Sequence, residues 1–238
     1  VRLSGSFAIN LFNFFRVDGS LAMSKQSATV QVTNEGAVEV DQLLLGGSGL
    51  NAFIGANAGA DPLNRGADAI GFNVVGVSFG VAIQRDANGR TFTSVEATTG
   101  AASFIGIEGL ELSATQLGLT INTVDSGTDV VDYAAGATDL TIATGGAPIT
   151  LSMAGSAGKL LLASGAVDVD LFGFMQLSGN FGIEKSIRTV TLSDAEEIEV
   201  DYFGIGASDV SAFVGVNGAT AAKLGFELDE LDFALALM

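Results

Sequence analysis

The chain of 238 residues contains no cysteine and no histidine. Without cysteine there is no disulfide framework, no thiolate nucleophile and no cysteine-ligated metal. Without histidine there is no Ser-His-Asp triad, no Cys-His pair and no histidine-ligated zinc. The residue constellations of the common hydrolases are therefore missing, and we expect a protein that is not an enzyme.

Positive charge is also scarce. The sequence has 10 Lys and Arg against 27 Asp and Glu, which gives a formal net charge of −17. Binding to a phosphate backbone requires clustered Lys and Arg, whereas the few cations here are scattered. We therefore expect no nucleic-acid partner. The acidity favours solubility and repulsion between copies.

Long apolar runs are missing as well. No stretch reaches 18 uninterrupted apolar residues, and no basic segment with an apolar core opens the chain, so neither a membrane-spanning helix nor a signal peptide is expected. No segment has the period of a long amphipathic helix. With 48% hydrophobic residues the chain is nevertheless too apolar to be disordered.

What the sequence does contain is strict alternation. Across residues 1–25, apolar side chains or glycines occupy almost every odd position. A period of two is that of a β-strand with one buried face, so the run predicts one unusually long strand. Similar runs recur along the chain and predict an all-β fold. The architecture expected is elongated, with long antiparallel strands and hairpins arranged as a β-sandwich, a β-solenoid or an open β-tube.

The chain also resembles itself. Residues 1–58 align with residues 161–218 without a gap, and 18 of the 58 positions are identical. Residues 70–83 align with residues 224–237 at a slightly shorter offset. The sequence therefore predicts a tandem repeat. Residues 1–66 would be the C-terminal part of one β repeat, residues 67–220 one complete repeat, and residues 221–238 the start of the next.

Seven phenylalanines are candidates for packing or assembly. Three stand in a recurring motif of a small residue, Phe, a β-branched residue and Gly, in which we expect the ring to fill a core. Four stand in two aligned pairs, on the face where the strands of residues 1–25 and 161–185 are otherwise polar. Exposed rings forfeit about 1.5 to 3 kcal/mol each relative to burial, so we expect these pairs to be covered within the unit or at a junction between copies. The motif residues are Phe53, Phe104 and Phe213, and the pairs are Phe12 with Phe14 and Phe172 with Phe174.

Turns and irregularities can be placed from the pattern. Residues 86–89 (DANG) predict a tight, exposed hairpin turn, because Asn-Gly supplies the positive φ that such a turn needs. The apolar phase switches between Val74 and Val75, and again between Leu228 and Asp229. One extra residue in a strand produces such a switch, which predicts a β-bulge at each place.

Calcium is the one cofactor that the acidic composition invites, since it binds carboxylates and carbonyls in loops. Candidate loops are residues 86–89 and residues 125–129 (DSGTD), but neither the EF-hand pattern nor the nonapeptide calcium repeat occurs. Both loops are equally good as plain turns. The sequence therefore assigns no cofactor, names no metal ligands and leaves calcium open.

Three strings carry a resemblance to a known family: residues 103–113 (SFIGIEGLELS), 119–123 (LTINT) and 172–181 (FGFMQLSGNF). They resemble the tandem β repeats of giant secreted bacterial surface proteins, including those with an LEPR-XLL N-terminal signature. The resemblance is one of pattern and covers nearly the whole chain. It implies an extracellular or cell-surface location in bacteria and an extended, structural or adhesin-like role.

Two hypotheses from different classes follow, with a third beside them. In the first, the chain is a structural repeat segment of a large adhesin-like or filament-forming protein, whose partners are neighbouring repeats or copies of itself. In the second, an apolar sheet face forms a groove or tube that binds or conducts lipid or another hydrophobic ligand. The third is an outer-membrane β-barrel. The apolar face distinguishes the first two, because an open surface larger than a few hundred Å² implies a ligand and a dry, packed one implies a structural core.

Overall fold

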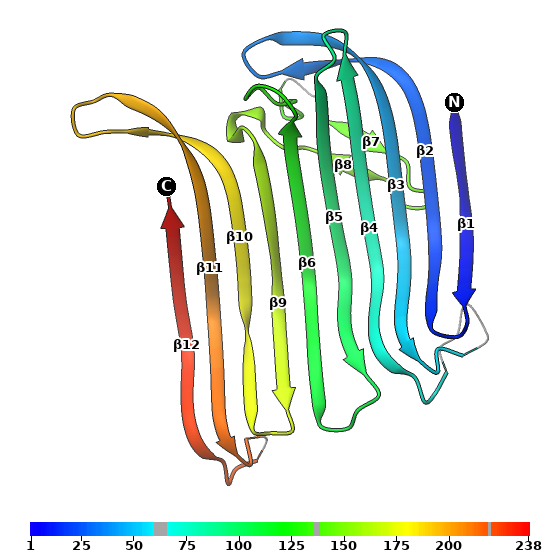
Figure 1. Cartoon of the computed structure of the whole chain (residues 1–238), viewed down its shortest axis with the longest axis vertical. Helices are drawn as coiled ribbons and strands as arrows, with labels where there is room; N and C mark the ends of the chain where they lie inside the picture. The colour runs from blue at the N-terminus through cyan, green and yellow to red at the C-terminus, as the bar shows by residue number, and fades with distance from the viewer. Residues whose placement is uncertain (60–65, 136–138, 219) are drawn as a thin grey trace.

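The fold is all-β, as the alternation predicts. The computed structural model describes residues 1–59, 66–135, 139–218 and 220–238, and ten of its strands form one antiparallel sheet in which every strand lies beside its neighbour in the sequence (Figure 1). Among these residues, no helix is both long enough and apolar enough to cross a membrane. The sheet strands are β1 (Arg2–Leu11), β2 (Phe15–Val32), β3 (Gly36–Ala56), β4 (Ile70–Asp86), β5 (Thr91–Ile105), β6 (Leu110–Val124), β9 (Leu160–Leu171), β10 (Met175–Thr191), β11 (Glu197–Val216) and β12 (Leu224–Leu237).

The opening run is two strands rather than one. β1 and β2 are joined by a tight turn in which Phe12 and Asn13 both have φ of 55° and the amide of Phe14 donates to the carbonyl of Leu11 at 3.0 Å. Positive φ at both central residues is the geometry of a type I′ hairpin turn. The alternation continues across this turn because the strands on either side place their apolar side chains on the same face. The prediction of a single long strand was therefore wrong.

The two stretches aligned by sequence form the same three strands, with bounds that agree to within two residues. We call residues 1–58 the first segment and residues 161–218 the second segment. β1 and β9 end at Leu11 and Leu171, β3 and β11 end at Ala56 and Val216, and these positions are 160 residues apart. The positive φ of Phe12 also returns at Phe172, where it is 56°. The aligned residues thus build the same strands and the same turn.

The predicted hairpin turn is confirmed. The amide of Gly89 donates to the carbonyl of Asp86 at 3.1 Å, Gly89 has φ of 88°, and Ala87 and Asn88 at the tip are exposed. This is a type I turn followed by a glycine in the left-handed region, the usual three-residue hairpin loop.

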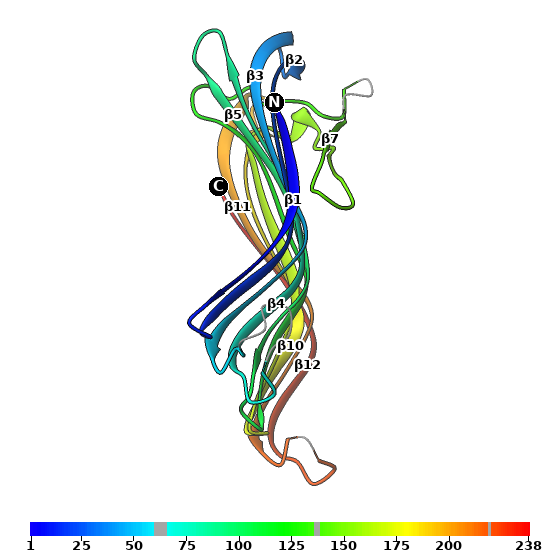
Figure 2. The same cartoon turned by 90° about the vertical axis from the view of Figure 1, so that its right-hand side faces the viewer.

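Both predicted bulges are present, each one residue further along than expected. On β4, Val75 and Gly76 stand opposite the single residue Asn51. On β12, Asp229 and Glu230 stand opposite the single residue Ser211. A bulge flips the phase of the following side chains, so the apolar residues on either side of it stay on one face. Bulges also increase the local twist, and Figure 2 shows a sheet that is strongly twisted along its length.

An insert separates β6 from β9. Its described residues, 125–135 and 139–159, leave the sheet, form the short hairpin of β7 (Leu140–Ile142) and β8 (Ile149–Leu151) and a 3-10 turn (Gly155–Ala157), and return to β9. Figure 2 shows the hairpin standing off one side of the sheet. The insert packs on β2 to β6 and creates the main core, which consists of Val32, Leu44, Ala82, Phe92, Val124, Val130, Val131, Tyr133, Ile142, Leu151 and Met153.

Candidate functional site

The described residues contain no cluster of three or more carboxylates arranged to hold a metal ion. The acidic side chains of the two candidate calcium loops instead bond within the protein. Asp86 accepts from the Arg90 guanidinium at 2.8 Å, and Asp125 accepts from the amide of Thr91 at 3.0 Å. Burial acts to raise the pKa of Asp86, but the hydrogen bonds from Arg90 outweigh it and hold that pKa below its usual range. These loops act as turns that tie neighbouring strands together.

One face of the sheet is apolar and open. A single row of paired residues crosses all ten strands, and nine of its ten members are apolar. The row consists of Leu3, Met23, Leu45, Val81, Val95, Ile121, Leu161, Lys185, Phe203 and Leu237.

A second row on the same face is apolar throughout. It consists of Leu11, Phe15, Ile54, Phe72, Phe104, Leu112, Val169, Leu177, Ala212 and Leu228. With strands about 4.8 Å apart and eight residues between the rows, this face measures about 1,000 Å².

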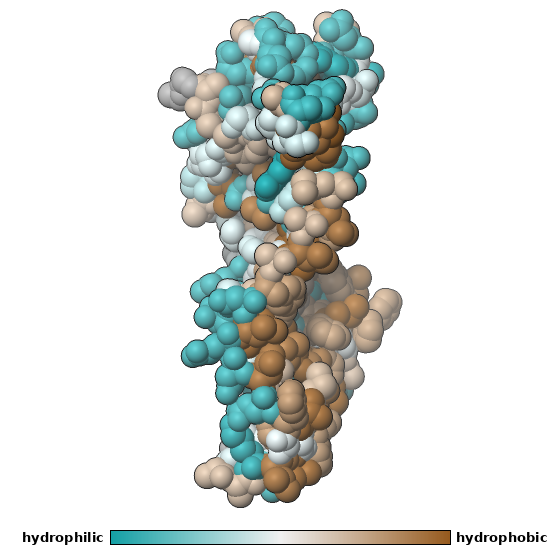
Figure 3. All heavy atoms as spheres, turned by 90° about the vertical axis from the view of Figure 1, so that its left-hand side faces the viewer, coloured by the Kyte–Doolittle hydropathy of each residue, from teal (hydrophilic) through white to brown (hydrophobic). Residues whose placement is uncertain are grey.

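Nothing in the described part of the chain covers this apolar face. Leu3 is 65% exposed at one edge, Phe72 is 55% exposed near the middle and Leu237 is 54% exposed at the other edge. In Figure 3, which looks onto the β12 edge, hydrophobic residues gather on one side of the sheet and hydrophilic residues on the other. The apolar face of the ten-stranded sheet is thus open, and no second sheet of the described chain packs on it. Soluble monomers seldom expose so large an apolar patch, which marks this face as a site of interaction.

The opposite face, which we call the polar face, mixes polar residues with the apolar residues of the main core, and the insert covers its first half. Tyr133 from the insert is 2% exposed, and its hydroxyl lies 2.9 Å from Ser94 Oγ and 3.2 Å from Gln84 Oε1. Gln84 Nε2 donates to Gln42 Oε1 at 3.1 Å, so β3, β4 and β5 are joined through one buried polar network. Burial raises the pKa of Tyr133 to about 12, while its bonds to Ser94 and Gln84 act to lower it. A satisfied network of this kind fixes the insert in one position.

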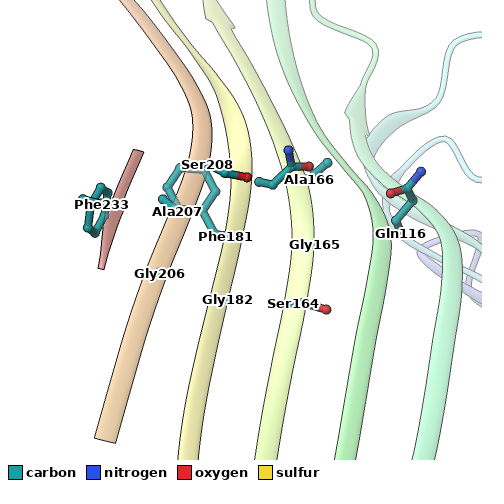
Figure 4. A pocket seen from close by; sticks show the side chains of 11 residues that line it. Gln116, Ser164, Gly165, Ala166, Phe181, Gly182, Gly206, Ala207, Ser208 and Phe233 are labelled. Carbon is teal, nitrogen blue, oxygen red and sulfur yellow. The ribbon is translucent and has the colours of Figure 1, made fainter. Parts of the chain in front are cut away.

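The second half of the polar face has no such cover. A shallow groove of about 470 Å³ lies there, between β6 and β12 (Figure 4). Asn180, Gly182, Gly206 and Ser208 are among its lining residues, and no charged side chain lines it.

Both outer strands of the sheet have one unpaired edge within the described chain. β1 pairs with β2 alone and β12 pairs with β11 alone. β9, which aligns with β1, has β6 on its other side, and β4, which aligns with β12, has β5 on its other side. The strands that correspond to β1 and β12 inside the sheet are thus paired on both edges.

The seven candidate phenylalanines divide into two groups. Phe53 and Phe213 fill a core as expected, at 3% and 5% exposed. Phe104 does not, because it lies on the open apolar face, where it packs edge-on against Phe72 with ring centroids 5.2 Å apart. The two aligned pairs are not buried within the unit, so that part of the expectation was wrong. They lie at or beside turns, and the exposed fractions are 98% for Phe12, 54% for Phe14, 57% for Phe172 and 58% for Phe174.

The apolar residues on either side of residues 145–148 (GGAP) predict the hairpin of β7 and β8, and this prediction is confirmed. The pattern did not show that the hairpin packs on the sheet, nor which residues it buries. Tyr133, Gln84 and Ser94 carry no local signal of burial, since polar residues in a strand usually face water.

No family model, no curated protein and no solved structure matches this chain.

Proposed function

We propose that this chain is a structural segment of a large extracellular bacterial surface protein, adhesin-like or filament-forming, and that its sheet is continued at both edges. The continuing strands come from neighbouring repeats or from further copies of the chain. The observation that carries the proposal is the pair of open edges. β1 and β12 each have an aligned counterpart inside the sheet that is hydrogen-bonded on both sides. Unpaired edges of long, apolar strands are templates for adding further strands.

The direction of the strands fits such an extension. In a sheet of ten antiparallel strands the first and last run in opposite directions, and Figure 1 shows β1 pointing down and β12 pointing up. Placing β12 of one copy beside β1 of the next therefore gives another antiparallel pair.

A turn residue at the β1 edge supports the same conclusion. The amide of Phe172 donates to the carbonyl of Gly109 at 2.6 Å, so the β9–β10 turn is held by the turn before β6. Phe12 has the same backbone conformation at the open edge, where it is 98% exposed. A strand added beside β1 would give Phe12 the cover that Phe172 already has.

Composition supports the extracellular part of the proposal. The lack of cysteine, the formal net charge of −17 and the resemblance to giant surface proteins fit a secreted protein that is exposed to water along its length.

A pair of lysine substitutions tests the edges. Leu235 on β12 and Ile183 on β10 stand in one cross-strand row and are 51% and 42% exposed. Lysine on an edge strand opposes strand addition. We expect Leu235→Lys to abolish self-association in sedimentation velocity and to remove filaments in electron micrographs. Ile183→Lys places the same charge on an inner strand, so we expect it to retain both self-association and filaments. Equal association of the two variants would contradict the proposal.

The open apolar face favours a second candidate function, the binding of lipid or another hydrophobic ligand. Its area of about 1,000 Å² exceeds what a soluble monomer normally exposes. The test is organic extraction of the purified native protein followed by mass spectrometry. Recovery of a stoichiometric lipid would support this function, and its absence from protein that remains dispersed would exclude it.

A further inference from the structure

The hairpin of β7 and β8 rests directly on glycines and serines of the first segment. A methyl group built on Gly46 of β3 would lie 2.3 Å from the carbonyl oxygen of Ala143. One built on Gly146, in the loop between β7 and β8, would lie 3.6 Å from Cβ of Ser48. The hairpin can approach this closely because the strand beneath it offers almost no side-chain bulk.

The groove of the second segment is the same surface without a hairpin. Gly206 and Ser208 align with Gly46 and Ser48, and both line the groove (Figure 4). A methyl group built on Gly206 would have no heavy atom nearer than 3.9 Å. The small residues that admit the hairpin in the first segment are thus present in the second, where nothing in the described chain occupies the space above them.

The position of the insert relative to β4 indicates which segment would fill the groove over β9 to β11. The insert follows β6, two strands after β4, and reaches back over β3 and β2. β12 aligns with β4. The hairpin that follows two further strands beyond β12 would therefore reach back over β11 and β10, where the groove lies.

Charge agrees with this assignment. Residues 140–151 (LTIATGGAPITL) contain no charged side chain, and the groove is lined by none. In a chain of formal net charge −17, an uncharged hairpin on an uncharged groove avoids both repulsion and the desolvation of a carboxylate.

We propose that the groove over β9 to β11 is a docking site for an uncharged, glycine-rich β-hairpin of the kind formed by residues 140–151, supplied by the segment that continues the sheet beyond β12. The inference rests on the proposed extension of the sheet. It adds that consecutive segments are locked together across the polar face as well as along the strand edges.

The absence of native cysteine allows a direct test by disulfide formation. Met238 aligns with Gln84, so the chain is lengthened by appending a second copy of residues 85–159 after Met238. Ser208→Cys is combined with Gly146→Cys in the appended copy. The matched control is Ser211→Cys with the same appended cysteine, because Ser211 lies on β11 and lines a separate groove. The positive control is Ser48→Cys with Gly146→Cys in the original chain, whose Cβ separation of 3.6 Å suits a disulfide.

We expect the Ser208 variant to form the disulfide under mild oxidation about 10-fold faster than the Ser211 control. The tether is the same in both variants, but docking places the appended cysteine next to residue 208 and not next to residue 211. No disulfide at Ser208, or equal rates at the two positions, would overturn the proposal. Hydrogen exchange of the β12 amides distinguishes failure of the hairpin site from failure of the proposed sheet extension. The β12 amides that do not face β11 are the ones that report on extension, because the others already bond to β11. Protection of these outward-facing amides without the disulfide leaves the sheet extension standing and removes the hairpin site, whereas their lack of protection overturns both.

A trans experiment covers the case in which the lengthened chain does not fold. A synthetic peptide of residues 139–153 with Gly146→Cys is incubated with the native-length Ser208→Cys chain. Preferential disulfide formation over the Ser211→Cys chain supports the site. Equal reaction with both chains, or no reaction with either, overturns it. If instead two chains exchange their own hairpins, the sample without peptide contains a dimer that has no disulfide, and this outcome also overturns the site.

Discussion

Ala82 on β4 and Ala236 on β12 occupy the same position in two aligned stretches, but Ala82 is fully buried beneath the insert while Ala236 is exposed. The same contrast holds for Gly46 and Gly206 and for the strands around them. Because the aligned strands have bounds that agree to within two residues, strand formation here depends on alternation and on pairing with the next strand. The cover over the polar face is a separate contribution, present in one half of the described chain and missing from the other.

The largest loss of unfolding free energy is expected in the core beneath the insert. Phe92 on β5 is 0% exposed within the insert core, whereas Phe226 on β12 is 74% exposed. Truncating a buried ring costs about 3–5 kcal/mol of unfolding free energy, and a largely exposed one changes it by about 0.5 or less. Phe92→Ala should therefore strongly lower the midpoint of urea unfolding and Phe226→Ala should leave it in place. Similar losses for both would show that the insert contributes no more than the bare half.

The second-largest effect is a loss of stability at high pH, caused by ionisation of Tyr133. Burial raises the pKa of Tyr133 to about 12, while an unfolded tyrosine titrates near pH 10. The folded chain holds this proton more tightly, so the stabilisation is complete below pH 10 and is lost as the pH rises toward 12. The expected loss is about 2–3 kcal/mol.

Urea unfolding of the parent and of Tyr133→Phe between pH 8 and 11.5 measures this loss. The variant lacks the titrating hydroxyl, so its unfolding free energy should fall less steeply with pH. Parallel curves for the two proteins would contradict the role given to Tyr133.

Alanine substitutions of the aligned glycines Gly46 and Gly206 compare the covered and uncovered halves of the polar face. In Gly46→Ala the new methyl meets the Ala143 carbonyl at 2.3 Å and must displace the hairpin, which costs about 1–3 kcal/mol. In Gly206→Ala the nearest atom is 3.9 Å away, so the change in stability should be within about 0.5 kcal/mol. Chemical denaturation of the two variants measures the difference. If Gly206→Ala were as costly as Gly46→Ala, the groove would already be occupied.

The smallest effect is expected at the aligned turns. The ring of Phe172 lies against Gly109 and is 57% exposed, so Phe172→Ser should cost about 1 kcal/mol in thermal or urea unfolding. Phe12 is 98% exposed, so Phe12→Ser should leave unfolding unchanged while weakening self-association at the β1 edge. If Phe12→Ser sedimented at the same rate as the parent, Phe12 would not be part of the proposed junction.

Much of the fold could be predicted from the sequence because β structure leaves a local record. Alternation located the strands, Asn88-Gly89 located a turn, and the phase switches located both bulges to within one residue. The turn at Phe12 was missed because Phe-Asn is an unusual pair for positive φ, and the alternation runs through it in phase.

The candidate site was less accessible to sequence reasoning. Whether the apolar face is covered depends on packing between distant parts of the chain, which alternation does not encode. The position of the insert is an example, since its contact with the sheet joins Thr33 to Val130 through bonds that span 97 residues.

The order of the strands also determines how the sheet would respond to mechanical force. Because the ten sheet strands pair in chain order, tension applied between β1 and β12 acts across the strands and loads their hydrogen bonds one after another. Such a sheet unzips strand by strand at low force. The insert changes this in one half, because it spans β2 to β6 and must detach before those strands can separate. Under tension β9 to β12 would therefore open first and extend the molecule, while the braced half stays folded as an anchor.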